Sequence, residues 1–131
     1  PERSSAASDV YKRQIGGFDE NIFLYHEDDD LSLRLKNTVG PLMYCPQANV
    51  IHEGGNSSLR NPKTAMLKGF HMGKSRVYAM KKYNINNYKV KCLLFAIIQL
   101  MSIEMLFSKR KRAKYLAFFK GVKEELKEDK V

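Results

Sequence analysis

The sequence predicts an α/β chain of short strands and helices, followed by an α-helical basic extension. Short apolar runs over residues 41–51, interrupted by Pro46, are typical of short strands. Apolar residues recur at helical spacing over residues 30–39 and in several stretches after residue 62. Residues 59–131 carry eighteen Lys or Arg against five acids, which makes the extension basic.

The chain divides into three parts. Residues 1–14 lack the apolar core of a secretory signal and any periodicity, and they resemble a non-native, adapter-like leader. Residues 15–83 contain the predicted strands and the helices between them. Residues 84–131 form the predicted amphipathic, basic helical extension.

The first predicted elements are a glycine loop and a helix. Gly16-Gly17 permits positive φ and close approach of a ligand, but no G-x-G-x-x-G or Walker pattern surrounds it, so a tight turn is the simpler interpretation. A helix is predicted from Asp30, because Leu31 and Leu35 are spaced i, i+4 and acids precede the first turn.

One or two short strands are predicted next, with His52 at the end of the second and Gly54-Gly55 after it. A helix follows over about residues 62–83, with its proline in the first turn. The side chains expected to face the core from this helix are Met66, Phe70, Val77 and Met80.

The most apolar stretch, residues 92–107, contains Gln99, Ser102 and Glu104. A membrane-spanning helix needs about 20 apolar residues and tolerates acids badly, so a full span is not expected. Basic residues flank the stretch, and residues 115–126 are amphipathic. Two interpretations stay open: helices packed on the domain with solvated lysines, or association with an anionic membrane surface.

Charge and cysteines restrict the function classes. The net charge is +9, yet residues 15–58 carry seven acids against two basic residues, so the basic surface belongs to the second half. Nucleic acid is not an expected partner, because only the charge favours it and no recognition motif accompanies it.

Cys45 and Cys92 lack the spacing of a zinc site or a disulfide framework, and a reducing cytosol is the expected setting.

Four consecutive acids, residues 27–30, are the principal candidate for chemistry. They could form a solvated first turn in which Asp30 or a neighbour caps the helix. Alternatively, one carboxylate is a general base and another orients a hydroxyl or lies near a metal. At a strand-to-helix junction, Glu27 and Asp29 need not share a side with Asp28 and Asp30. His52 is likewise either a structural histidine or a ligand of a divalent cation.

The order of these elements resembles the C-terminal part of the catalytic domain of family 2 glycosyltransferases, particularly bacterial rhamnosyltransferase-like members. The matching segments are "GGFDENIFLYHEDDDLSLRLKNTVG", which includes an aromatic strand before the acids, "MYCPQANVIHEGGNSS" and the helical "KSRVYAMKKY". The resemblance covers roughly residues 15–83, and the composite pattern is more specific than any of its pieces.

The resemblance implies the nucleotide-sugar-binding α/β fold called GT-A and, in most members, an inverting reaction. It places the general base at Asp28, with Glu27 beside it and Asp30 supporting, in the motif "HEDDD". It matches Gly16 and Gly17 to the loop that lies against donor and acceptor. The residue that it matches to the metal site is His52.

The implied cofactor is Mg²⁺ or Mn²⁺, and the implied partners are a nucleotide-sugar donor and a glycan or lipid-linked acceptor. The family's nucleotide-binding half, with its Asp-x-Asp motif, is not found upstream of Ile15. We therefore expect a C-terminal fragment that cannot transfer sugar alone. The expected location is the cytoplasm, peripherally at the inner face of the cell membrane.

Two other functions would each explain part of the sequence. A non-enzymatic, basic membrane-surface module would explain residues 89–131 but would leave the acidic loop without a role. A metal-dependent phosphoesterase could use clustered acids and a histidine, but it would normally show further His and Asp ligands.

Overall fold

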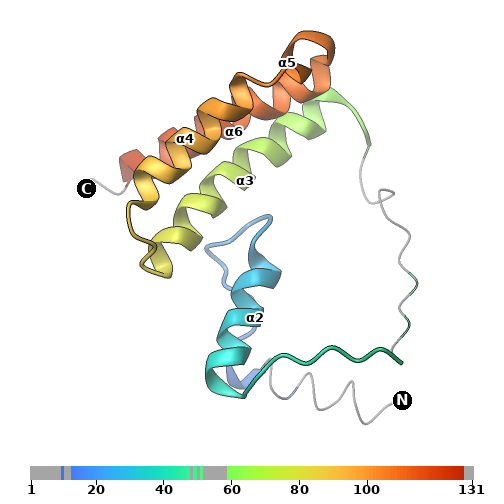
Figure 1. The fold of residues 1–131 in the computed structure, drawn as a ribbon, viewed down its shortest axis with the longest axis vertical. Coiled ribbons are helices and arrows are strands. Elements are labelled where there is room, and N and C mark those ends of the chain that lie inside the picture. Colours follow the sequence, from blue (N-terminus) through green and yellow to red (C-terminus); the bar gives the residue numbers. More distant parts are fainter. Residues whose placement is uncertain (1–9, 11–12, 48, 50, 52–58, 129–131) are drawn as a thin grey trace.

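The computed structural model describes residues 10, 13–47, 49, 51 and 59–128. Helices are the regular elements of this part of the chain (Figure 1). Those with both ends among the described residues are α2 (Glu27–Thr38), α3 (Pro62–Lys82), α4 (Tyr88–Leu100), α5 (Glu104–Phe107) and α6 (Lys109–Glu128). In Figure 1, α3, α4 and α6 lie together, whereas α2 extends away from them and approaches α3 at its N-terminal end.

The predicted α/β fold class, with its short GT-A strands, is wrong. No strand occurs among the described residues. The aromatic segment before the acids forms bends and turns, and residues 41–45 have no regular structure. Met43 and Tyr44 are 87% and 89% exposed. A strand is stable only when a neighbouring strand accepts its backbone hydrogen bonds, and the described chain supplies no such neighbour.

The predicted helix over residues 62–83 is confirmed as α3. Pro62 occupies the first turn, and the side chain of Asn61 accepts a hydrogen bond of 2.8 Å from the backbone N–H of Thr64. This cap satisfies one of the backbone donors that a helix N-terminus leaves free. Of the predicted core residues, Val77 is fully buried, whereas Met66 is 52% exposed.

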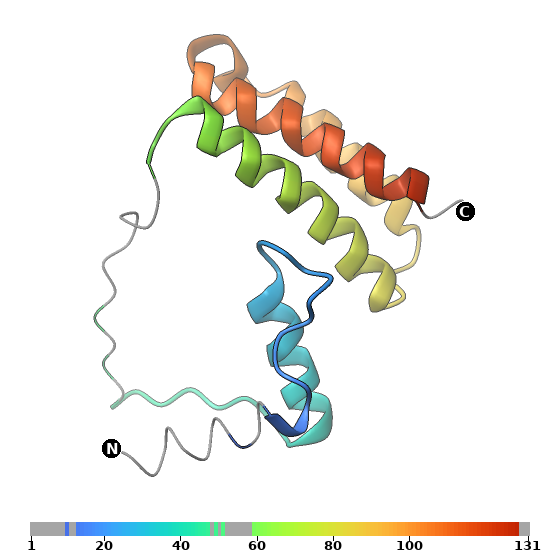
Figure 2. The same cartoon turned by 180° about the vertical axis from the view of Figure 1, so that it is seen from behind.

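Helices α3 and α6 lie side by side (Figure 2), and they touch through glycines. A Cβ atom added at Gly69 would collide with the carbonyl oxygen of Lys114, and one at Gly73 with that of Phe118. From the opposite helix, Gly121 meets the carbonyl oxygen of Phe70 in the same way. The two backbones therefore approach as closely as helices joined by small residues four positions apart.

The core lies where α3, α4 and α6 meet. Its buried members are Val77, Cys92, Ala96, Phe118 and Val122. The rings of Phe95 and Phe118 make an edge-to-face contact with centroids 5.7 Å apart. Both cysteines are free thiols, Cys92 in this core and Cys45 at the surface. The apolar and amphipathic segments after residue 84 form α4, α5 and α6, so the prediction that they are helical is confirmed.

None of the helices in the described chain combines the length and the apolar character that crossing a membrane requires.

Candidate functional site

All four acids lie in the first turn of α2, which begins at Glu27, three residues before the predicted start. Tyr25 and His26 precede it with φ of 65° and 69°, in the left-handed region that side chains other than glycine rarely adopt. These two residues turn the chain at the start of α2. No side chain caps the N-terminus of this helix with a hydrogen bond. The positive end of the helix dipole then faces the four carboxylates and offsets their mutual repulsion.

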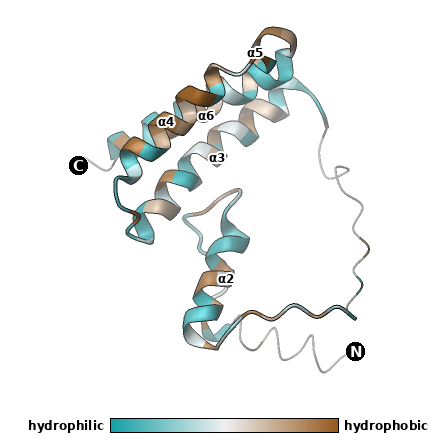
Figure 3. Cartoon of the chain, in the orientation of Figure 1, coloured by the Kyte–Doolittle hydropathy of each residue, from teal (hydrophilic) through white to brown (hydrophobic). Residues whose placement is uncertain are grey.

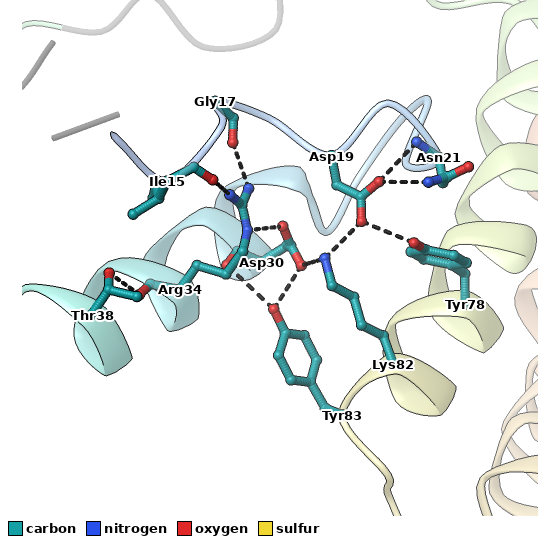
Figure 4. Close-up of polar contacts among 10 residues, drawn as sticks. All are labelled: Ile15, Gly17, Asp19, Asn21, Asp30, Arg34, Thr38, Tyr78, Lys82 and Tyr83. Atoms are coloured by element: carbon teal, nitrogen blue, oxygen red, sulfur yellow. Dashed lines mark hydrogen bonds and ion pairs between the residues drawn. The ribbon is translucent and has the colours of Figure 1, made fainter. Parts of the chain in front are cut away.

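Asp30 is the acid that points inward, and its side chain is fully buried (Figure 4). The Nζ atom of Lys82 and the hydroxyl of Tyr83 donate to its Oδ1 atom over 2.5 and 2.6 Å. The Nε atom of Arg34, one turn along α2, donates to Oδ2 over 2.8 Å. Burial alone would raise the pKa of Asp30, but these three donors outweigh it and hold the pKa below its usual range.

Lys82 also holds a second carboxylate. Its Nζ atom lies 2.6 Å from Oδ2 of Asp19, which in addition accepts a hydrogen bond of 2.9 Å from the hydroxyl of Tyr78 (Figure 4). Burial would lower the pKa of Lys82, but hydrogen bonds to Asp19 and Asp30 raise it. Hydrogen bonds from Lys82, Asn21 and Tyr78 likewise outweigh the burial of Asp19 and lower its pKa strongly. The ammonium group of Lys82, on α3, therefore binds a carboxylate of α2 and a carboxylate of the loop that follows Gly17.

Arg34 ties the glycine loop to α2. Its guanidinium donates to the carbonyl oxygens of Ile15 and Gly17 over 2.6 and 2.5 Å. Gly16 and Gly17 have φ of 82° and 70°, so the pair adopts the positive φ values that the sequence permits. No atom lies within 4 Å of a Cβ built on either glycine, so open space adjoins this loop.

The other acids of the turn differ from Asp30. Asp28 is exposed, and its carboxylate has no hydrogen bond or ion pair with any described residue. Asp29 accepts from Nδ1 of His26 over 3.1 Å. The Oε2 atom of Glu27 is buried and receives no hydrogen bond from the part of the chain that is described.

A depression of about 340 Å³ lies between the start of α2 and the C-terminal half of α3. Its lining includes His26, Asp29, Asp30 and Tyr83, but not Asp28. Of the two exposed acids, Asp29 therefore lines this depression and Asp28 lies outside it, while the buried Asp30 closes part of its wall.

The structure brings together most of the predicted site residues. Glu27, Asp28 and Asp30 share one helical turn, and Arg34 connects that turn to Gly17. His52, the predicted metal ligand, lies outside the described residues. Within the described chain, no three His, Cys, Asp or Glu side chains converge as a metal ion would require. The described residues therefore do not form a cation site by themselves.

Sequence reasoning assigned no role to the residues that hold the site together. These are Asp19, Arg34, Tyr78, Lys82 and Tyr83. Two signals were present: Asp30 and Arg34 are spaced i, i+4, and so are Tyr78 and Lys82. All five also lie within the segments "GGFDENIFLYHEDDDLSLRLKNTVG" and "KSRVYAMKKY".

Comparison with known proteins gives one short local similarity. The chain is 45% identical over 49 residues to N-acetylglucosaminyl-diphospho-decaprenol L-rhamnosyltransferase of Mycobacterium tuberculosis, in strains CDC 1551 / Oshkosh and ATCC 25618 / H37Rv. The aligned segment covers 37% of this chain and only 16% of the mycobacterial enzyme. No protein-family model and no solved structure matches. Over this segment, the chain is related to a glycosyltransferase.

Proposed function

We propose that this chain is part of a glycosyltransferase that moves a sugar from a nucleotide-sugar donor to a glycan or lipid-linked acceptor, with inversion and with Asp28 as the general base. The local similarity to a rhamnosyltransferase carries the proposal of sugar transfer, and a contrast within one helical turn favours Asp28 over Asp30 as the base. Asp30 is buried and engaged by three donors, whereas Asp28 is exposed and unpaired among the described residues. Only an accessible carboxylate can take a proton from an incoming hydroxyl.

In the proposed reaction, the Asp28 carboxylate removes the proton of an acceptor hydroxyl as its oxygen attacks the anomeric carbon. The new bond forms on the face opposite the leaving group, and the bond to the nucleoside diphosphate breaks with its electron pair. Asp28 then returns the proton to solvent. The start of α2 supports this role, because its dipole stabilises a carboxylate there between turnovers.

The neighbouring residues receive supporting roles in the proposal. Glu27 lies beside the base, and the open space around Gly16 and Gly17 is where donor and acceptor would approach the backbone. Asp30 positions the turn through Lys82 and does not meet substrate. A divalent cation, Mg²⁺ or Mn²⁺, would neutralise the leaving diphosphate, with His52 among its ligands.

The acceptor class rests on the mycobacterial relative, whose name specifies a diphospho-decaprenol-linked substrate. We extend the lipid-linked class to this chain and leave the donor sugar open. Because the aligned segment is 16% of that enzyme, the 131-residue chain assayed alone is expected to show no turnover.

The test is sugar transfer by the complete gene product in which this chain occurs, measured as formation of glycosylated lipid. Asp28→Asn is expected to lower kcat by about 10²- to 10⁴-fold, the usual contribution of a general base. Its melting temperature is expected to stay unchanged, since the side chain has no partner among the described residues.

The matched control is Asp29→Asn, the adjacent exposed acid of the same turn. It is expected to retain most of the activity. Full activity of Asp28→Asn, or equal losses in both variants, would overturn the assignment of the base.

A further inference from the structure

A band of exposed apolar side chains follows α4 and α5, and its role is not explained by sugar transfer. We define the α4–α5 apolar surface by its exposed members, which are Val90, Leu94, Ile97, Ile98, Met101, Ile103, Leu106 and Phe107. We propose that this surface docks the protein on an anionic lipid bilayer, with the helices lying in the plane of the interface. The proposal does not depend on the chemistry of the acid turn.

Helix α4 is apolar on two opposite faces, but only one of them is packed. Cys92 and Ala96 are fully buried against α3 and α6. The opposite face presents Leu94 and Ile98, which are 54% and 65% exposed. A surface helix normally carries polar residues on its outer face, so a second apolar face indicates a surface that is covered in use.

The apolar band continues into α5. Figure 3 shows apolar colouring along α4 and again at α5. Met101, Ile103 and Phe107 are 80%, 69% and 83% exposed, more than the members on α4. Large apolar side chains at a helix junction are suited to enter the boundary between headgroups and acyl chains.

The charges around the band identify the partner. Helix α4 contains no acid, and Lys91 is exposed one turn before Leu94, at the edge of the band. Lys109 and Arg110 are exposed just after α5. Glu104 is the acid of this region, and it is bound by Lys111 and by the hydroxyl of Tyr115. An apolar band with a positive rim complements anionic headgroups above acyl chains.

The geometry favours a bilayer surface over a second copy of the chain. Two copies meeting through the same band in a symmetric dimer would bring their basic rims together, and like charges would oppose that contact. Helix α4 has 13 residues, a length of about 20 Å, which suits a helix lying flat in the interface.

The experiment is co-sedimentation of the 131-residue chain with vesicles of phosphatidylcholine alone or mixed with phosphatidylglycerol. We expect binding to the mixed vesicles that weakens as salt is added, and little binding to phosphatidylcholine. The double variant Leu94→Gln with Ile98→Gln is expected to bind the mixed vesicles at least about tenfold more weakly, because it loses two apolar side chains that the bilayer would bury. Circular dichroism checks that it keeps its helices.

Two matched controls separate the band from general effects. Leu116→Gln changes a side chain of α6 that is 52% exposed but lies outside the band, and binding should not change. Lys91→Gln is expected to weaken binding about fivefold, the effect of one cation near an anionic surface, whereas Lys36→Gln on α2 should have no effect.

Three results would overturn the proposal. The first is no binding to the mixed vesicles by the folded chain. The second is equal binding to both vesicle types. The third is a dimer in sedimentation velocity that dissociates in the Leu94→Gln, Ile98→Gln variant, which would assign the band to a second copy.

Discussion

Asp28 and Asp30 are chemically identical and two residues apart, yet they have opposite environments. Successive residues of a helix are about 100° apart, so two positions place these side chains on opposite sides of α2. Asp30 therefore meets Lys82 and Tyr83 of the α3 segment, while Asp28 meets solvent. Asp30 is engaged in holding the structure, and Asp28 is the acid proposed as the base.

Replacement of Asp30 tests this division at the level of one residue. Asp30→Asn is expected to lower the free energy of unfolding by about 3 kcal/mol, because the variant leaves Lys82 and Arg34 without their shared carboxylate. The estimate is at the low end for a buried pair, since both partners partly reach solvent. Urea denaturation followed by circular dichroism measures it.

Asp28→Asn is the paired control and is expected to change stability by less than about 0.5 kcal/mol, as for other exposed positions. A destabilisation as large as that of Asp30→Asn would show that Asp28 has a structural partner. That result would also weaken its assignment as the base.

At the scale of elements, the contact between α3 and α6 depends on glycine rather than on large apolar side chains. Gly69, Gly73 and Gly121 each face a carbonyl oxygen of the opposite helix. A methyl group at any of them can be accepted only if the helices separate. Separation would loosen the packing of Val77 and Phe118 in the core between them.

Gly73→Ala is therefore expected to destabilise the protein by about 1–3 kcal/mol, the usual effect of overpacking, although alanine is the better helix former. Thermal melting gives the measurement. Gly40→Ala would not be a suitable control, because Gly40 has φ of 146°. Ser32→Ala, on α2 and away from the contact, is expected to leave the melting temperature nearly unchanged. An unchanged melting temperature for Gly73→Ala would contradict the close approach.

For the whole molecule, the attachment of α2 to the bundle is largely ionic, whereas the core of the bundle is apolar. Lys82 of α3 makes the principal polar connection, through ion pairs to Asp30 of α2 and to Asp19 of the loop before it. In addition, the hydroxyl of Ser75 donates to the carbonyl oxygen of Leu24 over 2.8 Å. Changes of pH should therefore act on the attachment before they act on the bundle.

The direction follows from the pKa shifts. The pKa values of Asp19 and Asp30 are lower in the folded chain than in the unfolded chain, where they are about 4. These two groups therefore stabilise the fold above about pH 4, and the stabilisation is lost as the pH falls through their pKa values in the folded chain. The raised pKa of Lys82 gives a stabilisation that is present below about pH 10 and is lost as the pH rises through its folded value. Burial and the hydrogen bond to Asp30 also raise the pKa of Tyr83 to about 12.

Amide hydrogen exchange is expected to show this order. As the pH is lowered below about 4, protection in α2 should fall while the buried part of α3 remains protected. Exchange rates must be corrected for their intrinsic dependence on pH. Simultaneous loss of protection in α2, α3 and α6 would show that the ionic attachment and the bundle form one cooperative unit.

Several features of the molecule were readable from local sequence. Pro62 marks the start of α3, the spacing of apolar residues predicts the helices after residue 84, and the Gly16-Gly17 pair adopts positive φ. The strands were mispredicted because a short apolar run is compatible with a strand or an extended loop. Only a partner strand distinguishes them, and pairing is not a local property.

The sequence by itself determined that helices form here and that the four carboxylates lie at the start of α2, although it placed the first residue of α2 three positions too late. It could do so because periodicity and helix-end chemistry act over neighbouring residues. Only the tertiary structure decided which carboxylate is buried. Lys82 and Tyr83 reach Asp30 from more than fifty positions away, and their arrival requires the packing of α3 against α2. The i, i+4 spacings of Asp30 with Arg34 and of Tyr78 with Lys82 are visible in the sequence, but a contact between two helices leaves no periodic signal, so the role of these residues as supports was missed.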